Sequence, residues 1–144
     1  MKKIKVAING FGRIGRGFFR LALQTDNIQI VALNDLTDVK TLAHLLKYDS
    51  THGVLANEIS TKGNSILVDG VEVPVFSQPN PQDLPWKDME VDVVLESTGR
   101  FLKNEQALQH VIAGAKKVLI SAPSPDAKTI VLGVNDELIS SDDF

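Results

Sequence analysis

The chain has 144 residues, of which 43% are hydrophobic and 23% are charged, and its net charge is −3. This size and composition are typical of a single globular domain, and the lack of a basic surplus argues against nucleic acid as a partner. No apolar run is long enough to span a bilayer, and the basic start lacks the apolar stretch of a signal peptide, so we expect a cytoplasmic location and no membrane partner. The absence of cysteine excludes disulfides, thiolate metal sites and a cysteine nucleophile within these residues.

The first third of the chain alternates between strand and helix patterns. Residues 4–8 are a short, nearly continuous β-branched run, as expected for a strand buried on both faces. A helix is predicted from Arg13. Its predicted buried face consists of Ile14, Phe18, Leu21 and Ala22. A second strand is predicted over residues 28–33 and a second helix over residues 39–46, with Asp38 as its N-cap.

The middle of the chain, residues 59–76, indicates short strands and tight turns. The Asp69-Gly70 pair between two apolar runs is a strong hairpin signal. A third helix is predicted from Asn104, as its cap, to Ala113, and Gly114 is expected to end it. The remaining predicted strands cover residues 91–96, 117–120 and 130–134.

This alternation predicts an α/β fold, a Rossmann-type doubly wound sheet that is mostly parallel. The β-hairpin region would be an excursion from that sheet. No linker divides the chain, so residues 1–144 are expected to form one domain.

Residues 9–16 contain glycines in the G-x-G-x-x-G order, at Gly10, Gly12 and Gly15. They follow the first predicted strand and open the first predicted helix, which is the context that a dinucleotide-binding loop requires. In such a loop the first glycine permits a tight turn, the second lets the backbone approach a pyrophosphate, and the third lets the helix pack closely on the sheet. Amides of the first helical turn then point at the phosphates. The alternative interpretation is a glycine-rich turn without a ligand.

Asp35 directly follows the second predicted strand, 20 residues beyond Gly15. An acid at this place binds the ribose hydroxyls of adenosine and repels a 2′-phosphate, so the sequence favours NAD over NADP. A hydrogen bond to a charged group contributes about 1.5–3 kcal/mol, roughly ten- to a hundredfold in affinity. The alternative interpretation is an N-cap or turn aspartate before the second helix.

Residues 8–16 resemble the opening signature of the glyceraldehyde-3-phosphate dehydrogenases. Further segments resemble the same family in the same order, so that the resemblance covers essentially the whole chain. These segments are residues 34–36, 46–53, 96–101, 114–118, 121–124 and 133–135. The resemblance implies that residues 1–144 form the NAD-binding domain of such an enzyme, with NAD as cofactor and the catalytic domain absent from this chain.

The resemblance also implies a set of cofactor contacts. The main chain of Arg13 and Ile14 would contact the pyrophosphate, Ser121 would face the nicotinamide side, and Asn9 would shape the phosphate loop. The wall beside the adenine and its ribose would consist of Thr98, Gly99 and Phe101. The full predicted set is Asn9, Gly10, Phe11, Gly12, Arg13, Ile14, Gly15, Asn34, Asp35, Gln78, Pro79, Ser97, Thr98, Gly99, Phe101 and Ser121.

One departure from the family lies before the tryptophan, where the family often has Glu-Arg-Asp-Pro and its arginine contacts adenosine. Residues 78–81 are Gln-Pro-Asn-Pro here, so that arginine is missing. The contact that remains possible is a main-chain one from Gln78 or Pro79, and Pro79 has no N–H to donate.

The resemblance implies a phosphorylating, NAD-dependent enzyme of glycolysis that oxidises glyceraldehyde 3-phosphate to 1,3-bisphosphoglycerate. It also implies that the full-length enzyme is a homotetramer. The reaction needs a cysteine thiolate to attack the aldehyde. The family's cysteine, histidine base and phosphate-binding residues lie beyond the segments matched here, and this chain has no cysteine. We therefore predict no catalytic residue within the chain and no activity for the chain alone.

Two other functions stay open at this point. One is a stand-alone nucleotide-binding module without catalysis. The other is the corresponding domain of an erythrose-4-phosphate dehydrogenase, although residues 96–101 and 121–123 favour the glyceraldehyde enzyme.

The three histidines are not spaced as metal ligands, so no metal site is predicted. His44 is expected in the core or at its edge, His52 in a turn, and His110 on the solvated face of a helix. Trp86 is expected to anchor its loop.

Overall fold

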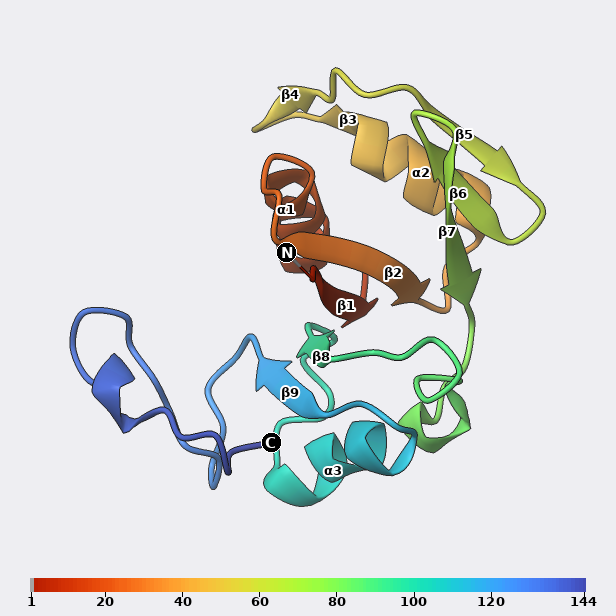
Figure 1. Cartoon of the computed structure of the whole chain (residues 1–144). Coiled ribbons are helices and arrows are strands. Elements are labelled where there is room, and N and C mark those ends of the chain that lie inside the picture. Colours follow the sequence, from red (N-terminus) through yellow and green to blue (C-terminus); the bar gives the residue numbers. More distant parts are fainter. Residues whose placement is uncertain (1) are drawn as a thin grey trace.

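The computed structural model describes residues 2–144, which form a seven-stranded sheet with helices on both of its faces (Figure 1). The strand order across the sheet is β5-β6-β7-β2-β1-β8-β9. The strands are β1 (Ile4–Asn9), β2 (Ile28–Asn34), β5 (Ile59–Lys62), β6 (Ser65–Val68), β7 (Val71–Phe76), β8 (Val93–Glu96) and β9 (Lys117–Ile120). A separate two-stranded ribbon consists of β3 (Tyr48–Asp49) and β4 (Gly53–Val54).

The pairing within the sheet confirms the predicted Rossmann-type fold. Strand β1 pairs in parallel with both β2 and β8, and the neighbouring pairs β2–β7 and β8–β9 are also parallel. Only β5–β6 and β6–β7 are antiparallel, and they form the predicted hairpin excursion at one edge. Two residues with positive φ, Asp69 (50°) and Gly70 (81°), make the β6–β7 turn, which is the backbone that a two-residue hairpin turn requires.

Helices α1 (Arg13–Ala22) and α2 (Val39–Lys47) cover one face of the sheet, and α3 (Asn104–Ile112) lies on the other, as Figure 1 shows. Asp38 is the N-cap of α2, as predicted, because its Oδ1 accepts from the Thr41 amide at 2.9 Å. The hydroxyl of Thr41, together with its amide, holds the pKa of Asp38 below its ordinary value. Two 3₁₀ turns, η1 (Pro81–Asp83) and η2 (Asp136–Leu138), complete the described elements.

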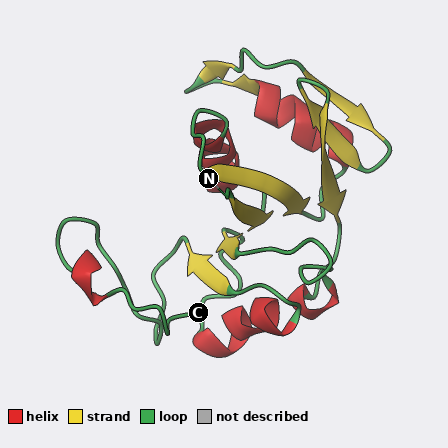
Figure 2. Cartoon of the chain, in the orientation of Figure 1, coloured by secondary structure: helices red, strands yellow, loops and turns green. Residues whose placement is uncertain are grey.

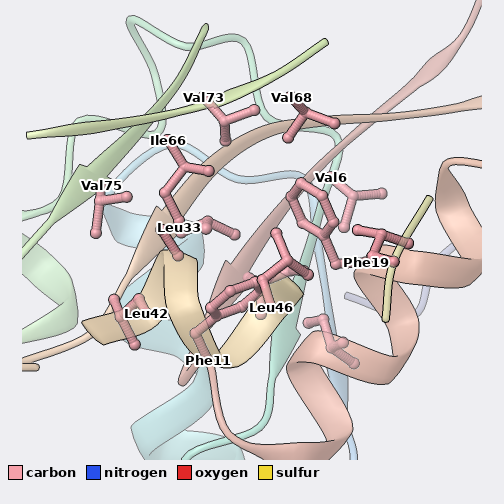
Figure 3. Close-up of a cluster of buried hydrophobic side chains, with 14 residues drawn as sticks. Val6, Phe11, Phe19, Leu33, Leu42, Leu46, Ile66, Val68, Val73 and Val75 are labelled. Atoms are coloured by element: carbon pink, nitrogen blue, oxygen red, sulfur yellow. The ribbon is translucent and has the colours of Figure 1, made fainter. Parts of the chain in front are cut away.

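The core consists of two clusters because alternate side chains of the central strands point to opposite faces. Val6 and Ile8 of β1 join the larger cluster under α1 and α2, whereas Ala7 joins the smaller one. In the larger cluster Phe11 and Phe19 meet edge to face with their ring centroids 5.6 Å apart (Figure 3). Trp86 is fully buried in the smaller cluster, so the expectation that it anchors its loop is confirmed.

The predicted buried face of α1 is partly correct, because Ala22 is buried and Phe18 packs against the core, but the other two predicted residues are exposed. Gly15, Phe19 and Ala22 are buried, whereas Ile14 is 60% and Leu21 is 64% exposed. The cause is the glycine, because a Cβ added at Gly15 would lie 2.4 Å from the carbonyl oxygen of Gly10. The residue without a side chain therefore lies closest to the sheet, and the apolar residue before it faces outward.

The predicted strand over residues 130–134 is also wrong, and Figure 2 shows this region as loop with one short helix beyond it. Side chains take the backbone groups that a ladder would use. Asn135 accepts from the Val131 amide at 2.6 Å and donates to the Thr129 carbonyl at 3.0 Å, and Asp136 accepts from the Gly133 amide at 2.7 Å. The strand predicted over residues 91–96 begins later, at Val93.

Helix α3 begins at Asn104 rather than being capped by it. Lys103 is the N-cap residue, and the Gln106 side chain accepts from the Lys103 amide at 3.2 Å. The Asn104 amide donates to Asp126 at 2.9 Å, so a distant carboxylate satisfies the first turn. Gly114, with a φ of +118°, follows the end of the helix as predicted.

Among residues 2–144, no helix has both the length and the apolar character that crossing a membrane would require.

Candidate functional site

A groove with a volume of about 300 Å³ lies where the carboxyl ends of β1, β2 and β8 meet. The chain winds from β1 to β2 on one side and reaches β8 on the other, so the groove is at the point where the strand order reverses. Open α/β sheets bind ligands at this position. The residues that line the groove are Asn9, Gly10, Gly12, Asn34, Asp35, Leu36, Thr37, Gln78, Pro79, Ser97, Thr98, Arg100 and Phe101.

The three glycines of the loop occupy three different environments. Gly10 has a φ of +92°, and a Cβ there would lie 2.8 Å from the backbone of Ser97 and Thr98. Gly15 is packed against the Gly10 carbonyl, as described above. A Cβ at Gly12 would meet nothing within 4 Å, although Gly12 lines the groove. Gly10 and Gly15 are therefore required by the fold, whereas the fold leaves Gly12 free to carry a side chain.

Gly12 is the N-cap of α1 and has no side chain that could cap the first turn. The first amides of a helix have no intrahelical partner, and they lie at the positive end of the helix dipole. Arg13 and Ile14, whose main chain was predicted to contact the pyrophosphate, are exposed at this end of α1 and lie outside the groove lining. This end of the helix can accept an anion beside Gly12.

Asp35 lines the groove beside the glycine loop and is held in place by two amides. Its Oδ2 accepts from the Phe11 amide at 2.8 Å, and its Oδ1 accepts from the Thr37 amide at 2.9 Å. The contact with Thr37 is an Asx turn, and Asp38 rather than Asp35 caps α2. Each carboxylate oxygen retains a lone pair, so Asp35 can still accept from a hydroxyl.

The Gln78 main chain, predicted as a contact to the cofactor, is also bonded to Asn34. The Gln78 amide donates to Asn34 Oδ1 at 2.9 Å, and the Gln78 carbonyl accepts from Asn34 Nδ2 at 2.9 Å. Gln78 and Pro79 do line the groove. Their main chain shapes that wall, and the second lone pair of the Gln78 carbonyl is the acceptor left to a ligand.

The opposite wall follows β8. The Ser97 hydroxyl donates to the Gly10 carbonyl at 2.6 Å and so ties this wall to the glycine loop. Thr98, Arg100 and Phe101 complete it.

The other predicted residues lie outside the lining. Phe11 is buried in the core, where only its amide reaches the site through Asp35. Gly15 packs on Gly10, and Gly99 has a φ of +75° in the turn that joins Thr98 to Arg100. Ser121 follows β9, and its amide donates to the Glu96 carbonyl at 3.0 Å.

Sequence reasoning missed three lining residues, namely Leu36, Thr37 and Arg100. Leu36 and Thr37 directly follow Asp35, and Arg100 lies between two predicted residues, so extending each predicted segment along the chain would have found them.

His52 lies in a turn, as predicted, whereas the other two histidines differ from expectation. His44 is exposed and packs on Tyr48, with ring centroids 4.9 Å apart. His110, expected to be solvated, has no exposed surface and contacts Glu96 and Trp86. No group of three or more histidine or acidic residues within residues 2–144 is arranged to hold a metal ion.

Comparisons with known proteins agree with this geometry. The family described as "Glyceraldehyde 3-phosphate dehydrogenase, NAD binding domain" matches residues 4–104. The chain is 56% identical over 135 residues to glyceraldehyde-3-phosphate dehydrogenase from Geobacillus stearothermophilus, covering 93% of this chain and 40% of that protein. The enzyme of that name from Mycoplasma pneumoniae is 52% identical, covering 99% of this chain and 43% of that protein. The one from Thermotoga maritima is 53% identical, covering 92% of this chain and 41% of that protein.

The chain thus spans about two-fifths of the length of these curated relatives. The family match covers more than half of the chain and includes both the glycine loop and Asp35. The chain belongs to the family of NAD-binding domains of glyceraldehyde 3-phosphate dehydrogenase.

Proposed function

We propose that this chain binds NAD in the groove and forms the cofactor-binding part of a phosphorylating glyceraldehyde-3-phosphate dehydrogenase. The reaction of the whole enzyme would be the oxidation of glyceraldehyde 3-phosphate to 1,3-bisphosphoglycerate in glycolysis. The observation that carries the proposal is the open space at Gly12, which lines the same groove as the Asp35 carboxylate at the switch point of the sheet.

The groove residues fit a dinucleotide. Gly12 leaves room for a diphosphate beside the first amides of α1, and Arg13 and Ile14 supply those amides. Asp35 accepts from the adenosine ribose hydroxyls and disfavours the 2′-phosphate of NADP. Thr98 and Phe101 form the adenine side of the groove.

The nicotinamide, when bound, supplies the hydride acceptor for the oxidation. This chain's residues bind and orient the cofactor, and none of them is a cysteine that could form the thiohemiacetal. Catalysis therefore requires residues outside these 144. A cytoplasmic homotetramer without nucleic-acid partners is the assembly we propose for the whole enzyme.

Calorimetric titration with NAD and NADP tests the proposal. We expect NAD to bind and NADP to bind at least about tenfold more weakly, because Asp35 accepts from one and repels the other. Gly12→Val is the second test, since we expect it to keep the fold and to occupy the space beside the first amides of α1. Equal affinities for the two dinucleotides, or NAD binding that Gly12→Val does not change, would contradict the proposal.

A further inference from the structure

A chain of buried polar side chains reaches the groove at Asn9 and Asn34 and continues beneath it through residues with no predicted cofactor contact. It links Trp86 and His110, on the α3 face of the sheet, to side chains at the carboxyl ends of β8, β1 and β2. Each of its side chains is at least nine-tenths buried, with exposed fractions of 0% for Trp86 and His110, 1% for Glu96, 2% for Asn9 and 4% for Asn34. Buried polar groups carry a large penalty unless each of them is paired.

Glu96 is the centre of this network. Its Oε1 accepts from Asn9 Nδ2 at 2.6 Å and from His110 Nε2 at 2.8 Å. Its Oε2 accepts from the Thr98 amide at 3.0 Å and the Thr98 hydroxyl at 2.7 Å. A carboxylate without its proton is an acceptor only, and four donors converge on it, so this site is built for the ionised form.

Trp86 determines which nitrogen of His110 carries the proton. The indole Nε1–H can only donate, and it lies 3.0 Å from His110 Nδ1. His110 Nδ1 must therefore accept, and the neutral imidazole carries its proton on Nε2, where it donates to Glu96. His110 Nε2 and Asn9 Nδ2, which lie 3.4 Å apart, are then two donors that share one acceptor.

Both walls of the groove end on this network. On one side the Thr98 hydroxyl donates to Glu96 and accepts from the Arg100 amide at 3.1 Å. On the other side Asn9 Oδ1 accepts from Asn34 Nδ2 at 2.8 Å. The Asn34 side chain in turn donates to the Gln78 carbonyl through Nδ2 and accepts from the Gln78 amide through Oδ1. One carboxylate therefore fixes the position of the two walls relative to each other.

We infer that Glu96 is a positioning residue for the cofactor site, which acts by holding the Thr98 wall and the Gln78 wall at the separation that NAD requires. The inference rests on the proposed function. Glu96 does not line the groove, but it contacts the lining residues Asn9 and Thr98 directly and reaches Asn34 through Asn9. Glu96 contributes to the width of the groove. The loss of the Glu96 charge therefore weakens NAD binding in a protein that remains folded.

Glu96→Gln isolates this effect because no orientation of the new amide satisfies the network. With its NH₂ toward Thr98, it meets the Thr98 N–H donor. With its NH₂ toward the other side, it meets Asn9 Nδ2, whose own carbonyl is occupied by Asn34, and His110 Nε2–H, whose tautomer Trp86 fixes. Glu96→Asp keeps both acceptor oxygens and the charge, and serves as the conservative variant.

The test compares the wild-type full chain with Glu96→Gln, Glu96→Asp and the control Glu105→Gln, which removes an exposed carboxylate from α3. Calorimetry gives the Kd for NAD at a temperature below every melting transition. We expect Glu96→Gln to weaken NAD by about tenfold or more, Glu96→Asp to restore part of the affinity, and Glu105→Gln to match the wild type.

Imidazole ¹⁵N shifts of the wild type provide a readout that does not depend on any variant folding. We expect His110 to be neutral with its proton on Nε2, and a proton on Nδ1 would overturn the inference. If the wild type binds NAD and folded Glu96→Gln binds it equally well, the inference fails while the proposed function stands. If the wild type does not bind NAD, the proposed function fails and the inference fails with it.

Discussion

Three glycines within six residues of each other should respond differently to the same added methyl group. A Cβ at Gly15 would lie 2.4 Å from the Gly10 carbonyl oxygen, a backbone atom that cannot rotate away. A Cβ at Gly12 or at Gly17 would meet nothing within 4 Å, but only Gly12 lines the groove. We therefore expect Gly15 to be required by the fold, Gly12 to be required by the ligand, and Gly17 to be required by neither.

The magnitudes follow from these contacts. Gly15→Ala overpacks the contact between helix and sheet, which costs about 1–3 kcal/mol, and helix propensity returns about 1 kcal/mol. The net loss is then up to about 2 kcal/mol. Gly17→Ala keeps only the propensity gain of about 0.5–1 kcal/mol. Gly12→Val loses about 0.5–1 kcal/mol from a poorer N-cap, and its side chain occupies the space that the pyrophosphate needs.

Thermal melts and NAD calorimetry on the same samples measure both effects. Gly15→Ala should melt lower, at about 4 °C per kcal/mol for a chain of this size, and Gly17→Ala should melt higher with an unchanged Kd. Gly12→Val should melt close to the wild type and bind no measurable NAD. A Gly12→Val variant that binds NAD normally, or a Gly15→Ala variant that is more stable than the wild type, would refute the reasoning.

Three further predictions concern single side chains. Asp35→Ala should weaken NAD by roughly ten- to a hundredfold and narrow its advantage over NADP in calorimetric titrations, and an unchanged affinity would remove Asp35 from the site. Arg20→Ala should lower the free energy of unfolding in urea by about 1–2 kcal/mol without changing the Kd for NAD, because Arg20 Nη2 donates to the carbonyls of Leu46 (2.8 Å) and Gly53 (2.9 Å). The Lys116 ammonium, with the Lys5 amide, holds the pKa of Asp92 below its ordinary value of 3.8. The Asp92 carboxylate therefore stabilises the fold above pH 3.8, and this contribution is lost as the pH falls through the lower pKa of the folded state. Asp92→Asn should therefore lower the urea midpoint at pH 7, and the difference from wild type should shrink in acid; a constant difference would contradict this.

Features encoded by adjacent residues could be predicted from the sequence. The Asp69-Gly70 turn needs positive φ at both positions, and the glycine loop needs a strand before it and a helix after it. Both features can therefore be predicted from neighbouring residues in the sequence. Asp38 could be placed as a cap because its partner, Thr41, lies three residues away.

Features that depend on distant partners could not be predicted in this way. His110 is buried because Glu96 and Trp86, 14 and 24 residues away in the sequence, satisfy both of its ring nitrogens. An apolar pattern counts Gly15 as neutral, yet its lack of a side chain determines which face of α1 approaches the sheet. For the same reason the network beneath the groove has no signature in residue spacing, since its members come from three strands, a helix and a loop.

The most direct test of the central claim is a crystal structure of this chain grown with NAD. We predict the diphosphate beside Gly12 at the start of α1, with the adenosine ribose hydroxyls within hydrogen-bonding distance of the Asp35 carboxylate. An empty groove, or a dinucleotide bound elsewhere on the molecule, would contradict the account.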